Sequence, residues 1–197
     1  MIELQHRATP TELLSEFVAA NPQLTPADFS SVAFQPVKRQ VKADLNADQG
    51  GLCVYCEKPL GPNEGQIDHI KPKDGPHGHP HLCFSYVNYA HSCINPKTCG
   101  QQKKSGLLPI EPQPGCNAEW MLSTDGTIMP IAGLSRQRRH AVVQTRDMLG
   151  LNKDANLVDE RKRWLASVLA IGQAQPQDML LFLQTAPYRH ILATVSL

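Results

Sequence analysis

The sequence predicts an α+β fold in which a small metal-binding centre is embedded in a mainly helical chain. Three observations lead to this prediction. Apolar residues recur at helical spacing near the start of the chain and again in its last third. A loop-rich stretch between them carries four cysteines in two pairs, and a short segment within it has the features of a strand. The length of 197 residues suits one compact domain.

Residues 1–50 are predicted to form an N-terminal helical segment. A Thr-x-x-Glu capping box at residues 9–12, with proline at the first helical position, predicts a helix through about residue 20. Val37, Val41 and Leu45 are spaced four apart, which places them on one stripe of a later helix. Two consecutive glycines follow this stripe, and we expect the helix to end there.

The central segment, residues 51–106, has a different composition. Glycine, proline, histidine and cysteine dominate it, and neither helical nor strand periodicity extends through it. A loop-rich segment of this length is uncommon inside a compact chain unless something other than regular structure holds it in place. We therefore expect a bound metal ion to organise this segment.

Residues 107–197 are predicted to contain a β-hairpin and then a C-terminal helical segment. The hairpin turns at Asp125-Gly126, a dipeptide that suits the tight turn between antiparallel strands. Helices are expected over residues 135–150 and around the apolar stripe of residues 157–169, which we interpret as core. All three segments are expected to belong to one compact domain.

Composition and charge exclude several classes of protein. A hydrophobic content of 41% with 19% charged residues is an ordinary globular balance, which argues against wholesale disorder. The formal net charge of +1 provides no general attraction to nucleic acid, so any such contact must be a local patch. No apolar run resembles a signal peptide or is long enough to span a bilayer. We therefore expect a cytoplasmic protein with no membrane partner.

Four of the six cysteines form two pairs with the spacing of metal ligands. Two residues separate Cys53 from Cys56, and five separate Cys93 from Cys99, which is wider than usual. In a reducing compartment, two such thiolate pairs predict a structural Zn²⁺ site. A redox role for the first pair would require a preceding strand, whereas a helix is predicted there. We interpret the other two cysteines as small buried hydrophobes: Cys83 and Cys116.

An acidic residue and a histidine lie between the two cysteine pairs. Isoleucines flank Asp68 and His69, so we predict a short strand that carries both near its end. The histidine could act as a general base on water, and the carboxylate could hold Mg²⁺ or Mn²⁺. Asn88 lies five residues before Cys93, and we expect its amide to fix the tautomer of the imidazole. These three residues are the predicted catalytic residues.

The central residues resemble a known family. The segments CVYCE, IDHIKPK, NYAHSC and CGQQKKSG resemble an HNH nuclease with a four-cysteine zinc site. The flanking segments STDGTIMP and LGLNKDANLVDERKRW extend the resemblance over nearly the whole chain, to the PtuB-type nucleases of Septu and retron-associated anti-phage systems. The residues that fall on the family pattern are Asp68, His69, Asn88, Cys93, Cys99 and Lys103.

The resemblance implies a fold, a reaction and a partner. The fold is a ββα-metal core, also called a His-Me finger, over residues 51–106. The reaction is hydrolysis of phosphodiester bonds in nucleic acid, in which Asp68 holds a catalytic Mg²⁺ or Mn²⁺, His69 activates water and Asn88 orients His69. DNA is expected ahead of RNA, with tRNA as an alternative. The partner is a PtuA-like ABC-type ATPase in a bacterial anti-phage system.

One position departs from the family pattern. The second ligand of the catalytic metal, an Asn or His, usually follows the last cysteine directly, but this chain has Gly100 there. Glycine has no side chain, so the ligand must come from elsewhere or be water. The candidates are His91, Asn95, Gln101 and Gln102. The departure also favours an alternative function, a zinc-ribbon adaptor that binds nucleic acid or protein without cutting.

Basic residues and histidines surround the motif. The predicted phosphate contacts are Lys71, Lys73, Lys103 and Lys104. A Pro/Gly-rich loop carries three histidines, and we expect it to be mobile and to cover the site instead of holding a further zinc: His77, His79 and His81. The basic run at residues 136–140 is interpreted mainly as a solvated helix face.

Overall fold

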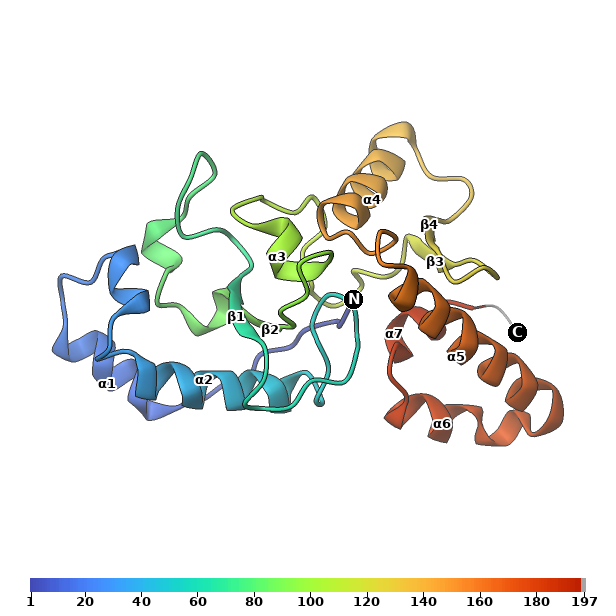
Figure 1. Cartoon of the computed structure of the whole chain (residues 1–197), viewed down its shortest axis with the longest axis horizontal. Coiled ribbons are helices and arrows are strands. Elements are labelled where there is room, and N and C mark those ends of the chain that lie inside the picture. Colours follow the sequence, from blue (N-terminus) through green and yellow to red (C-terminus); the bar gives the residue numbers. More distant parts are fainter. Residues whose placement is uncertain (196–197) are drawn as a thin grey trace.

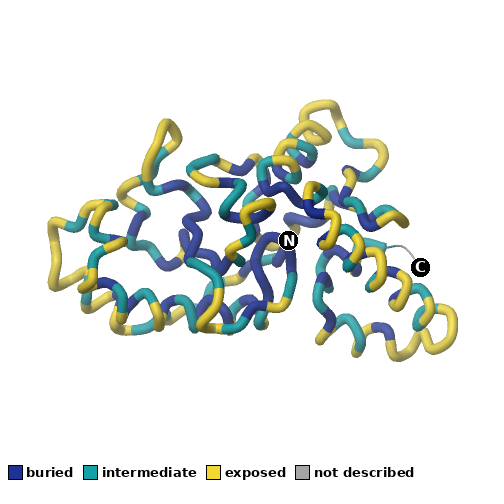
Figure 2. The backbone as a smooth tube through the Cα atoms, viewed as in Figure 1, coloured by how far each residue is buried: buried dark blue, intermediate teal, exposed yellow. Residues whose placement is uncertain are grey.

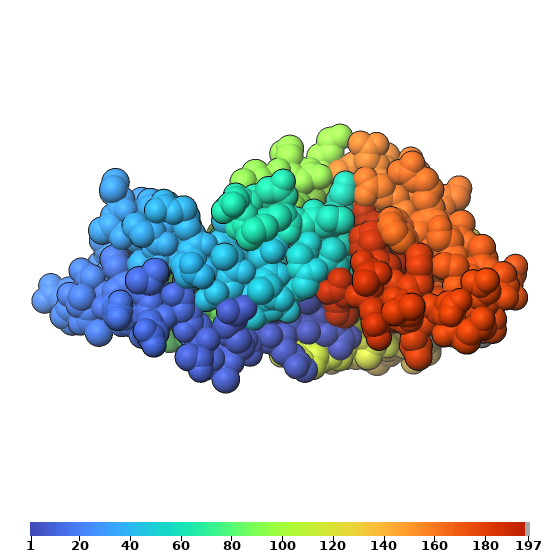
Figure 3. Space-filling view, turned by 90° about the horizontal axis from the view of Figure 1, so that it is seen from below, coloured from blue at the N-terminus to red at the C-terminus, as the bar shows by residue number. Residues whose placement is uncertain are grey.

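Helices form the two ends of the molecule, and a small sheet lies between them (Figure 1). This computed structural model describes residues 1–195. Helices α1 (Glu12–Ala20) and α2 (Gln35–Asp48) lie at one end, and α5 (Ala155–Ala174) and α6 (Met179–Thr185) at the other. The space-filling view shows the same division, with the N-terminal helices and the C-terminal helices at opposite ends (Figure 3).

The N-terminal helical segment forms as predicted, with one shift. Helix α1 begins at Glu12, two residues later than the capping box suggested, because the side chain of Thr11 accepts the N–H of Leu13. A 3₁₀ helix, η1 (Pro26–Ser30), follows it. The stripe predicted for α2 is buried, and the helix ends before Gly50, whose φ is 61°.

The central segment contains two short strands and a short helix. Strands β1 (Gln66–His69) and β2 (Tyr89–Ser92) are antiparallel, with Ile67 opposite His91 and Asp68 opposite Ala90. Two 3₁₀ turns, η2 (Pro80–Leu82) and η3 (Tyr86–Asn88), lie in the connection between the strands. Helix α3 (Cys99–Lys103) follows β2. Helix α2 packs against both strands, so the first predicted segment supports the second.

The predicted hairpin is present in the third segment. Strands β3 (Trp120–Leu122) and β4 (Ile128–Pro130) are antiparallel, and the turn between them contains Gly126 with φ 88°. A Cβ at this glycine would lie 2.2 Å from the carbonyl oxygen of Val158, so no larger residue fits against α5. Three further elements complete the chain: α4 (Arg136–Met148), η4 (Pro176–Asp178) and α7 (Arg189–Leu192).

The core consists of two clusters of buried apolar side chains. The larger cluster contains residues from both ends of the chain and from the first cysteine knuckle, and it includes the apolar stripe predicted for α5. The smaller cluster joins α1 and α2 to β1 and β2 around Phe34, which is fully buried. Figure 2 shows the buried backbone running through the middle of the molecule. Within residues 1–195, no helix combines the length and apolar character needed to cross a bilayer.

Candidate metal centre and catalytic cavity

The two predicted cysteine pairs meet in one buried cluster. All four sulfur atoms lie within 4.8 Å of one another. Cys53 Sγ is 3.8 Å from Cys99 Sγ, and Cys56 Sγ is 3.9 Å from Cys93 Sγ. Four thiolates at about 2.3 Å from a tetrahedral Zn²⁺ lie about 3.8 Å apart, so the cluster has the dimensions of a zinc site. Helix α2, and no strand, leads into the first pair, which removes the structural support for the redox alternative.

The first cysteine knuckle is a tight turn held by backbone hydrogen bonds. The N–H of Glu57 donates to the carbonyl of Cys53 at 2.9 Å, and the N–H of Cys53 donates to the carbonyl of Lys58 at 2.8 Å. Glu57 adopts a φ of 62°, in the left-handed region, which turns the chain back after Cys56. The turn brings both thiols of the pair to the same side.

The extra residues of the second knuckle form a turn around Asn95. The side-chain oxygen of Asn95 accepts the N–H of Lys97, and its carbonyl accepts the N–H of Thr98. Its amide nitrogen donates to Asp154, the residue that caps α5. The wider spacing is therefore accommodated by a turn fastened to the C-terminal helices. Asn95 is engaged in this turn and does not line the cavity described next.

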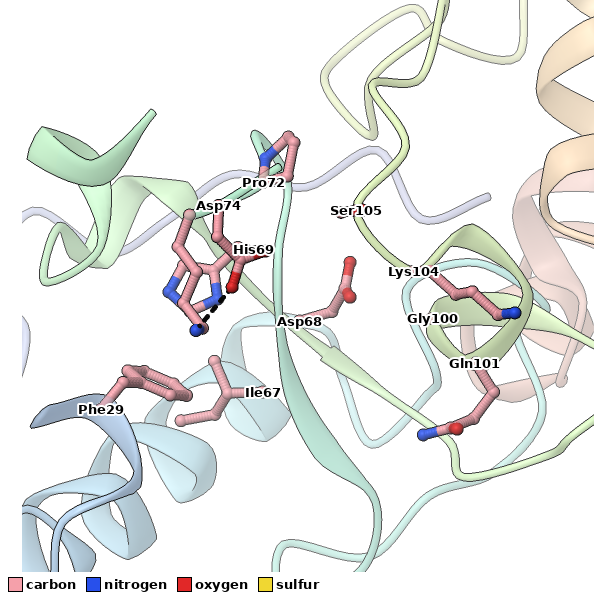
Figure 4. A pocket seen from close by; sticks show the side chains of 11 residues that line it. Phe29, Ile67, Asp68, His69, Pro72, Asp74, Gly100, Gln101, Lys104 and Ser105 are labelled. Atoms are coloured by element: carbon pink, nitrogen blue, oxygen red, sulfur yellow. Dashed lines mark hydrogen bonds and ion pairs between the residues drawn. The ribbon is translucent and has the colours of Figure 1, made fainter. Parts of the chain in front are cut away.

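Strand β1 presents Asp68 and His69 on opposite sides, because successive side chains of a strand alternate (Figure 4). The histidine ring lies toward Phe29, and the carboxylate lies toward Gly100 at the start of α3. Both residues line one cavity of about 340 Å³. The strand therefore places an acid and a base along the wall of the same space.

The imidazole of His69 is held in one tautomer by a backbone carbonyl. Its Nε2 lies 3.0 Å from the carbonyl oxygen of Cys83. A carbonyl oxygen can only accept, so Nε2 carries the proton and Nδ1 keeps a free lone pair. The rings of Phe29 and Tyr89 contact the imidazole edge-on. Burial lowers the pKa of His69 to about 4 and outweighs the opposite effect of the Cys83 hydrogen bond. The ring is therefore neutral at pH 7 and able to accept a proton.

The carboxylate of Asp68 uses one oxygen for protein contacts and leaves the other free. Its Oδ2 accepts the hydroxyl of Tyr55 and lies 3.1 Å from the ammonium of Lys103. Burial raises the pKa of Asp68, against the opposing effects of Lys103 and Tyr55. No side chain among the described residues donates a hydrogen bond to Oδ1, which lies 3.1 Å from the point where a Cβ on Gly100 would be. Oδ1 is thus the oxygen able to bind a cation.

The predicted contact of Asn88 with the imidazole is wrong. Its side-chain oxygen accepts the N–H of Lys71, and its amide nitrogen donates to the carbonyls of Lys71 and Leu82. Asn88 therefore joins the backbone after β1 to the turn before β2. The carbonyl of Cys83, and not this amide, fixes the tautomer of His69. Asn88 donates to the carbonyl of Leu82, the residue before Cys83, and so supports the loop that carries the Cys83 carbonyl.

The structure does not bring His91 to Asp68. His91 is paired with Ile67 across the sheet, on the face opposite to Asp68, and it is fully buried. Its Nε2 lies 2.8 Å from the carbonyl of Glu64, and its Nδ1 lies 3.2 Å from the amide of Asn46. Both ring nitrogens have protein partners, so this histidine supports the sheet and offers no free nitrogen to a cation beside Asp68.

The four predicted phosphate contacts occupy different environments. Lys103 is 3% exposed, and its ammonium contacts Asp68 and the carbonyl of His69. Because this ammonium is buried and already paired, the prediction of Lys103 as a phosphate contact is wrong. Lys73 and Lys104 line the cavity. The ammonium of Lys73 is 3.0 Å from Asp74 at the surface. Lys71 is half-buried and lines a second, neighbouring cavity.

The donor sets of the two centres differ in their fit to metal. Four thiolates in a tetrahedral arrangement fit Zn²⁺. Beside Asp68, one free carboxylate oxygen is the chemistry that Mg²⁺ or Mn²⁺ accepts, since such ions bind through one or two carboxylates and keep several waters. Outside the cysteine cluster, residues 1–195 hold no other group of three His, Cys, Asp or Glu ligands. A cation bound by Asp68 would therefore need amide or water oxygens to complete its coordination.

Sequence reasoning missed two residues of the site. Tyr55 lies within the first cysteine knuckle, and its hydroxyl reaches Asp68 only because the knuckle folds over β1. The carbonyl of Cys83 fixes His69, but a backbone group leaves no signature in a sequence. The one signal in the sequence that could have pointed to Tyr55 is its position between Cys53 and Cys56. A rigid turn between two metal ligands fixes the side chains inside it, so such a residue can hold a neighbouring group in place.

Comparison with known proteins agrees with this arrangement of a thiolate cluster beside an Asp-His cavity. The chain is 42% identical over 206 aligned residues to "Retron Vc95 putative HNH endonuclease" of Vibrio cholerae serotype O1 biovar El Tor, and the alignment covers 100% of both chains. No family model matches the chain. Full coverage at this identity shows that the chain belongs to the HNH endonuclease family represented by that retron protein, which confirms the resemblance seen in the sequence.

Proposed function

We propose that the protein is a metal-dependent endonuclease that hydrolyses phosphodiester bonds of nucleic acid. The observation that carries this proposal is a neutral histidine and a free carboxylate oxygen on one cavity wall, His69 and Asp68. A general base and a cation-binding oxygen are the two groups that one-metal phosphodiester hydrolysis requires. The name of the retron relative supports the same reaction class.

The proposed catalytic core is a ββα-metal unit formed by β1, β2 and α3. The order of these elements along the chain and the position of Asp68 and His69 on β1 support it. The zinc cluster supports the unit from both sides, because one knuckle precedes β1 and the other joins β2 to α3. In this proposal Zn²⁺ has a structural role, and it takes no part in the reaction.

The protein side chains would act on an attacking water and on the phosphate. Nδ1 of His69 would take the proton of the water, while the carbonyl of Cys83 keeps Nε2 protonated and the ring oriented. Lys103 and Tyr55 would hold Asp68 so that Oδ1 points into the cavity. A Mg²⁺ or Mn²⁺ ion bound there would supply Lewis-acid stabilisation of the phosphate and of the leaving oxygen. Lys73 and Lys104 would contact neighbouring phosphates.

The biological role proposed for this activity is anti-phage defence in a retron system. The full-length similarity to a retron protein supports this role. DNA remains the expected substrate, with tRNA as the alternative, and the PtuA-like ABC-type ATPase stays a prediction that rests on the sequence resemblance. We also propose that residues 1–50, 51–106 and 107–197 act as one domain, supported by a core cluster that combines residues from all three segments.

One observation favours the second candidate function, a zinc-dependent adaptor without catalysis. Gly100 leaves Asp68 without a second side-chain ligand from the start of α3. An adaptor would keep the zinc cluster and the basic surface, and it would bind nucleic acid equally well with or without Mg²⁺.

A cleavage assay separates the two functions. Wild-type protein and His69→Ala would be incubated with plasmid DNA and with total tRNA, at low salt, with Mg²⁺, Mn²⁺ or EDTA. The nuclease proposal predicts metal-dependent cutting of at least one polymer by the wild type and none by the variant, with equal zinc content in both. Cutting that persists in His69→Ala would contradict the assigned role of His69. Binding without cutting, unaffected by the metal, would favour the adaptor.

A further inference from the structure

The space that a side chain at position 100 would fill is occupied by a glutamine from β1. A Cβ on Gly100 would lie 2.7 Å from Nε2 of Gln66, 3.1 Å from Oδ1 of Asp68 and 3.2 Å from Oγ of Ser92. Gln66 and Asp68 are two residues apart on β1, so their side chains lie on the same face of the sheet. The amide of Gln66 and the free oxygen of Asp68 therefore lie beside the same point.

The amide of Gln66 is paired with a second glutamine on α3. Nε2 of Gln101 donates to Oε1 of Gln66 at 2.7 Å, and Gln101 lines the cavity together with Asp68. Each primary amide carries one acceptor and two donor hydrogens, so the pair can form this hydrogen bond in either direction. If both amides rotate by half a turn, Nε2 of Gln66 donates to Oε1 of Gln101, so the hydrogen bond is kept. Oε1 of Gln66 then takes the place of its Nε2 beside Gly100.

We propose that Gln66, through Oε1, is the second protein ligand of the divalent cation bound by Oδ1 of Asp68, and that Gln101 positions it. This inference rests on the proposed nuclease function. In the structure, Nε2 of Gln66 and Oδ1 of Asp68 border the same point beside Gly100. With Mg²⁺ or Mn²⁺ bound, an amide oxygen is the preferred neighbour, since these ions bind through oxygen. A strand residue thus replaces a ligand from the helix, and Gly100 provides the space for it.

The other candidates for a second ligand are engaged elsewhere. The amide of Gln102 donates to the carbonyl of Pro96 at 2.6 Å, and Gln102 does not line the cavity. Asn95 holds the turn of the second knuckle, and His91 lies on the opposite face of the sheet. Gln66 and Gln101 are the amides that lie beside Gly100 and the cavity.

The test is a Mn²⁺ titration of the full-length, zinc-loaded protein, followed by the EPR signal of free Mn²⁺. We expect Gln66→Ala to weaken Mn²⁺ binding about tenfold or more, and Gln101→Ala to weaken it less, as a positioning residue would. Gln102→Ala is the matched control, because it removes the same chemical group from the next residue of α3, and we expect binding within twofold of the wild type. Gln66→Glu should bind Mn²⁺ more tightly, since a carboxylate replaces the amide.

A reciprocal exchange tests the geometry. Gly100→Asn alone should perturb the site, because its Cβ would lie 2.7 Å from the amide of Gln66. The double variant Gln66→Ala/Gly100→Asn lacks the side-chain amide of Gln66, so the amide of the asparagine at position 100 can enter the space that it leaves. The double variant should recover Mn²⁺ binding to within about threefold of the wild type, and a double variant no better than Gln66→Ala would argue against the exchange.

Asp68→Ala distinguishes failure of this inference from failure of the proposed function. If Asp68→Ala abolishes Mn²⁺ binding while Gln66→Ala and Gln66→Glu match the wild type, the role of Gln66 is overturned and the metal site stands. If the wild type binds no Mn²⁺ and cuts neither polymer, both are overturned. Zinc content and a thermal melt of each variant report folding. Should Gln66→Ala lose zinc, the isosteric Gln66→Glu decides alone, and unchanged Mn²⁺ binding overturns the proposal.

Discussion

The cysteine cluster and the Asp68–His69 cavity are neighbouring centres that differ in how completely their own residues define them. The cluster has four like ligands within 4.8 Å of one another, supplied by two turns. The cavity has one free carboxylate oxygen, one neutral imidazole and a glycine at the point where a further side chain would contact both Gln66 and Asp68. The first donor set is complete, as in a structural zinc site, and the second would leave positions open for water.

The comparison shows that a closed site depends on ligand spacing and an open one on its supporting contacts. Zinc sites of four thiolates need only the four sulfurs and the turns that carry them. In the cavity, the properties of Asp68 and His69 come from three other parts of the chain: the Tyr55 hydroxyl, the Cys83 carbonyl and the Lys103 ammonium. Changes at these positions should alter the cavity and leave the cluster intact.

Removal of a cysteine ligand should have the largest effect. Cys53→Ser is expected to abolish zinc binding and unfold the central segment, because the free energy of metal binding to such a site, on the order of 10 kcal/mol, is also folding free energy. Zinc analysis and circular dichroism would measure the loss. Cys116→Ser is the control, since Cys116 is buried outside the cluster. A Cys53→Ser protein that keeps its zinc and its melting temperature would contradict the structural role of the site.

Two adjacent lysines should separate support of the cavity from contact with phosphate. Lys103→Met leaves Asp68 buried without its cation partner, and we expect the free energy of unfolding to fall by about 3 kcal/mol. Lys104 is exposed, so Lys104→Met should change stability by less than about 0.5 kcal/mol. Denaturant titrations would measure both. Equal stability of the two variants would show that the buried ion pair has no supporting role.

The burial of His69 should make stability depend on pH. Its folded pKa of about 4 lies below the unfolded value of 6.5, so the unfolded chain binds the proton first as pH falls. The stability is unaffected above about pH 6.5 and decreases below it, by about 2 kcal/mol at pH 5. The test is the difference in unfolding free energy between wild type and His69→Gln at pH 7.5 and at pH 5. A difference that does not change with pH would contradict the buried neutral imidazole.

The smallest effect is expected at the rim of the cavity. In a His69→Ala background that binds without cutting, Lys104→Ala should weaken nucleic-acid binding for all sequences and reduce the slope of log K against log salt by about one. Arg139→Ala on α4 is the control, because Arg139 is an exposed cation on a helix that does not line the cavity. Fluorescence anisotropy at several salt concentrations would measure both, and identical slopes for the two variants would remove Lys104 from the phosphate-binding surface.

Sequence reasoning anticipated the elements better than their contacts. The stripe of Val37, Val41 and Leu45 and the turn at Asp125-Gly126 are local patterns, and the structure confirms both. The four cysteines were grouped correctly because two turns of suitable spacing are also local features. The expected partner of His69 was wrong, since the residue that reaches the ring is decided by the path of the loop between β1 and β2. The contact of Gln66 with the space beside Gly100 joins two elements, and nothing in either segment alone indicates it.

The most direct test of the proposed division into a structural zinc centre and a catalytic metal centre is a cleavage assay combined with metal analysis of the same samples. Protein prepared without added Mg²⁺ or Mn²⁺ should carry about one zinc per chain and cut neither plasmid DNA nor tRNA, and addition of Mg²⁺ or Mn²⁺ should start cutting. Asp68→Ala should keep the zinc and remain inactive at every metal concentration. Full cutting by the protein that contains only zinc, or normal cutting by Asp68→Ala, would contradict the division into a structural and a catalytic centre.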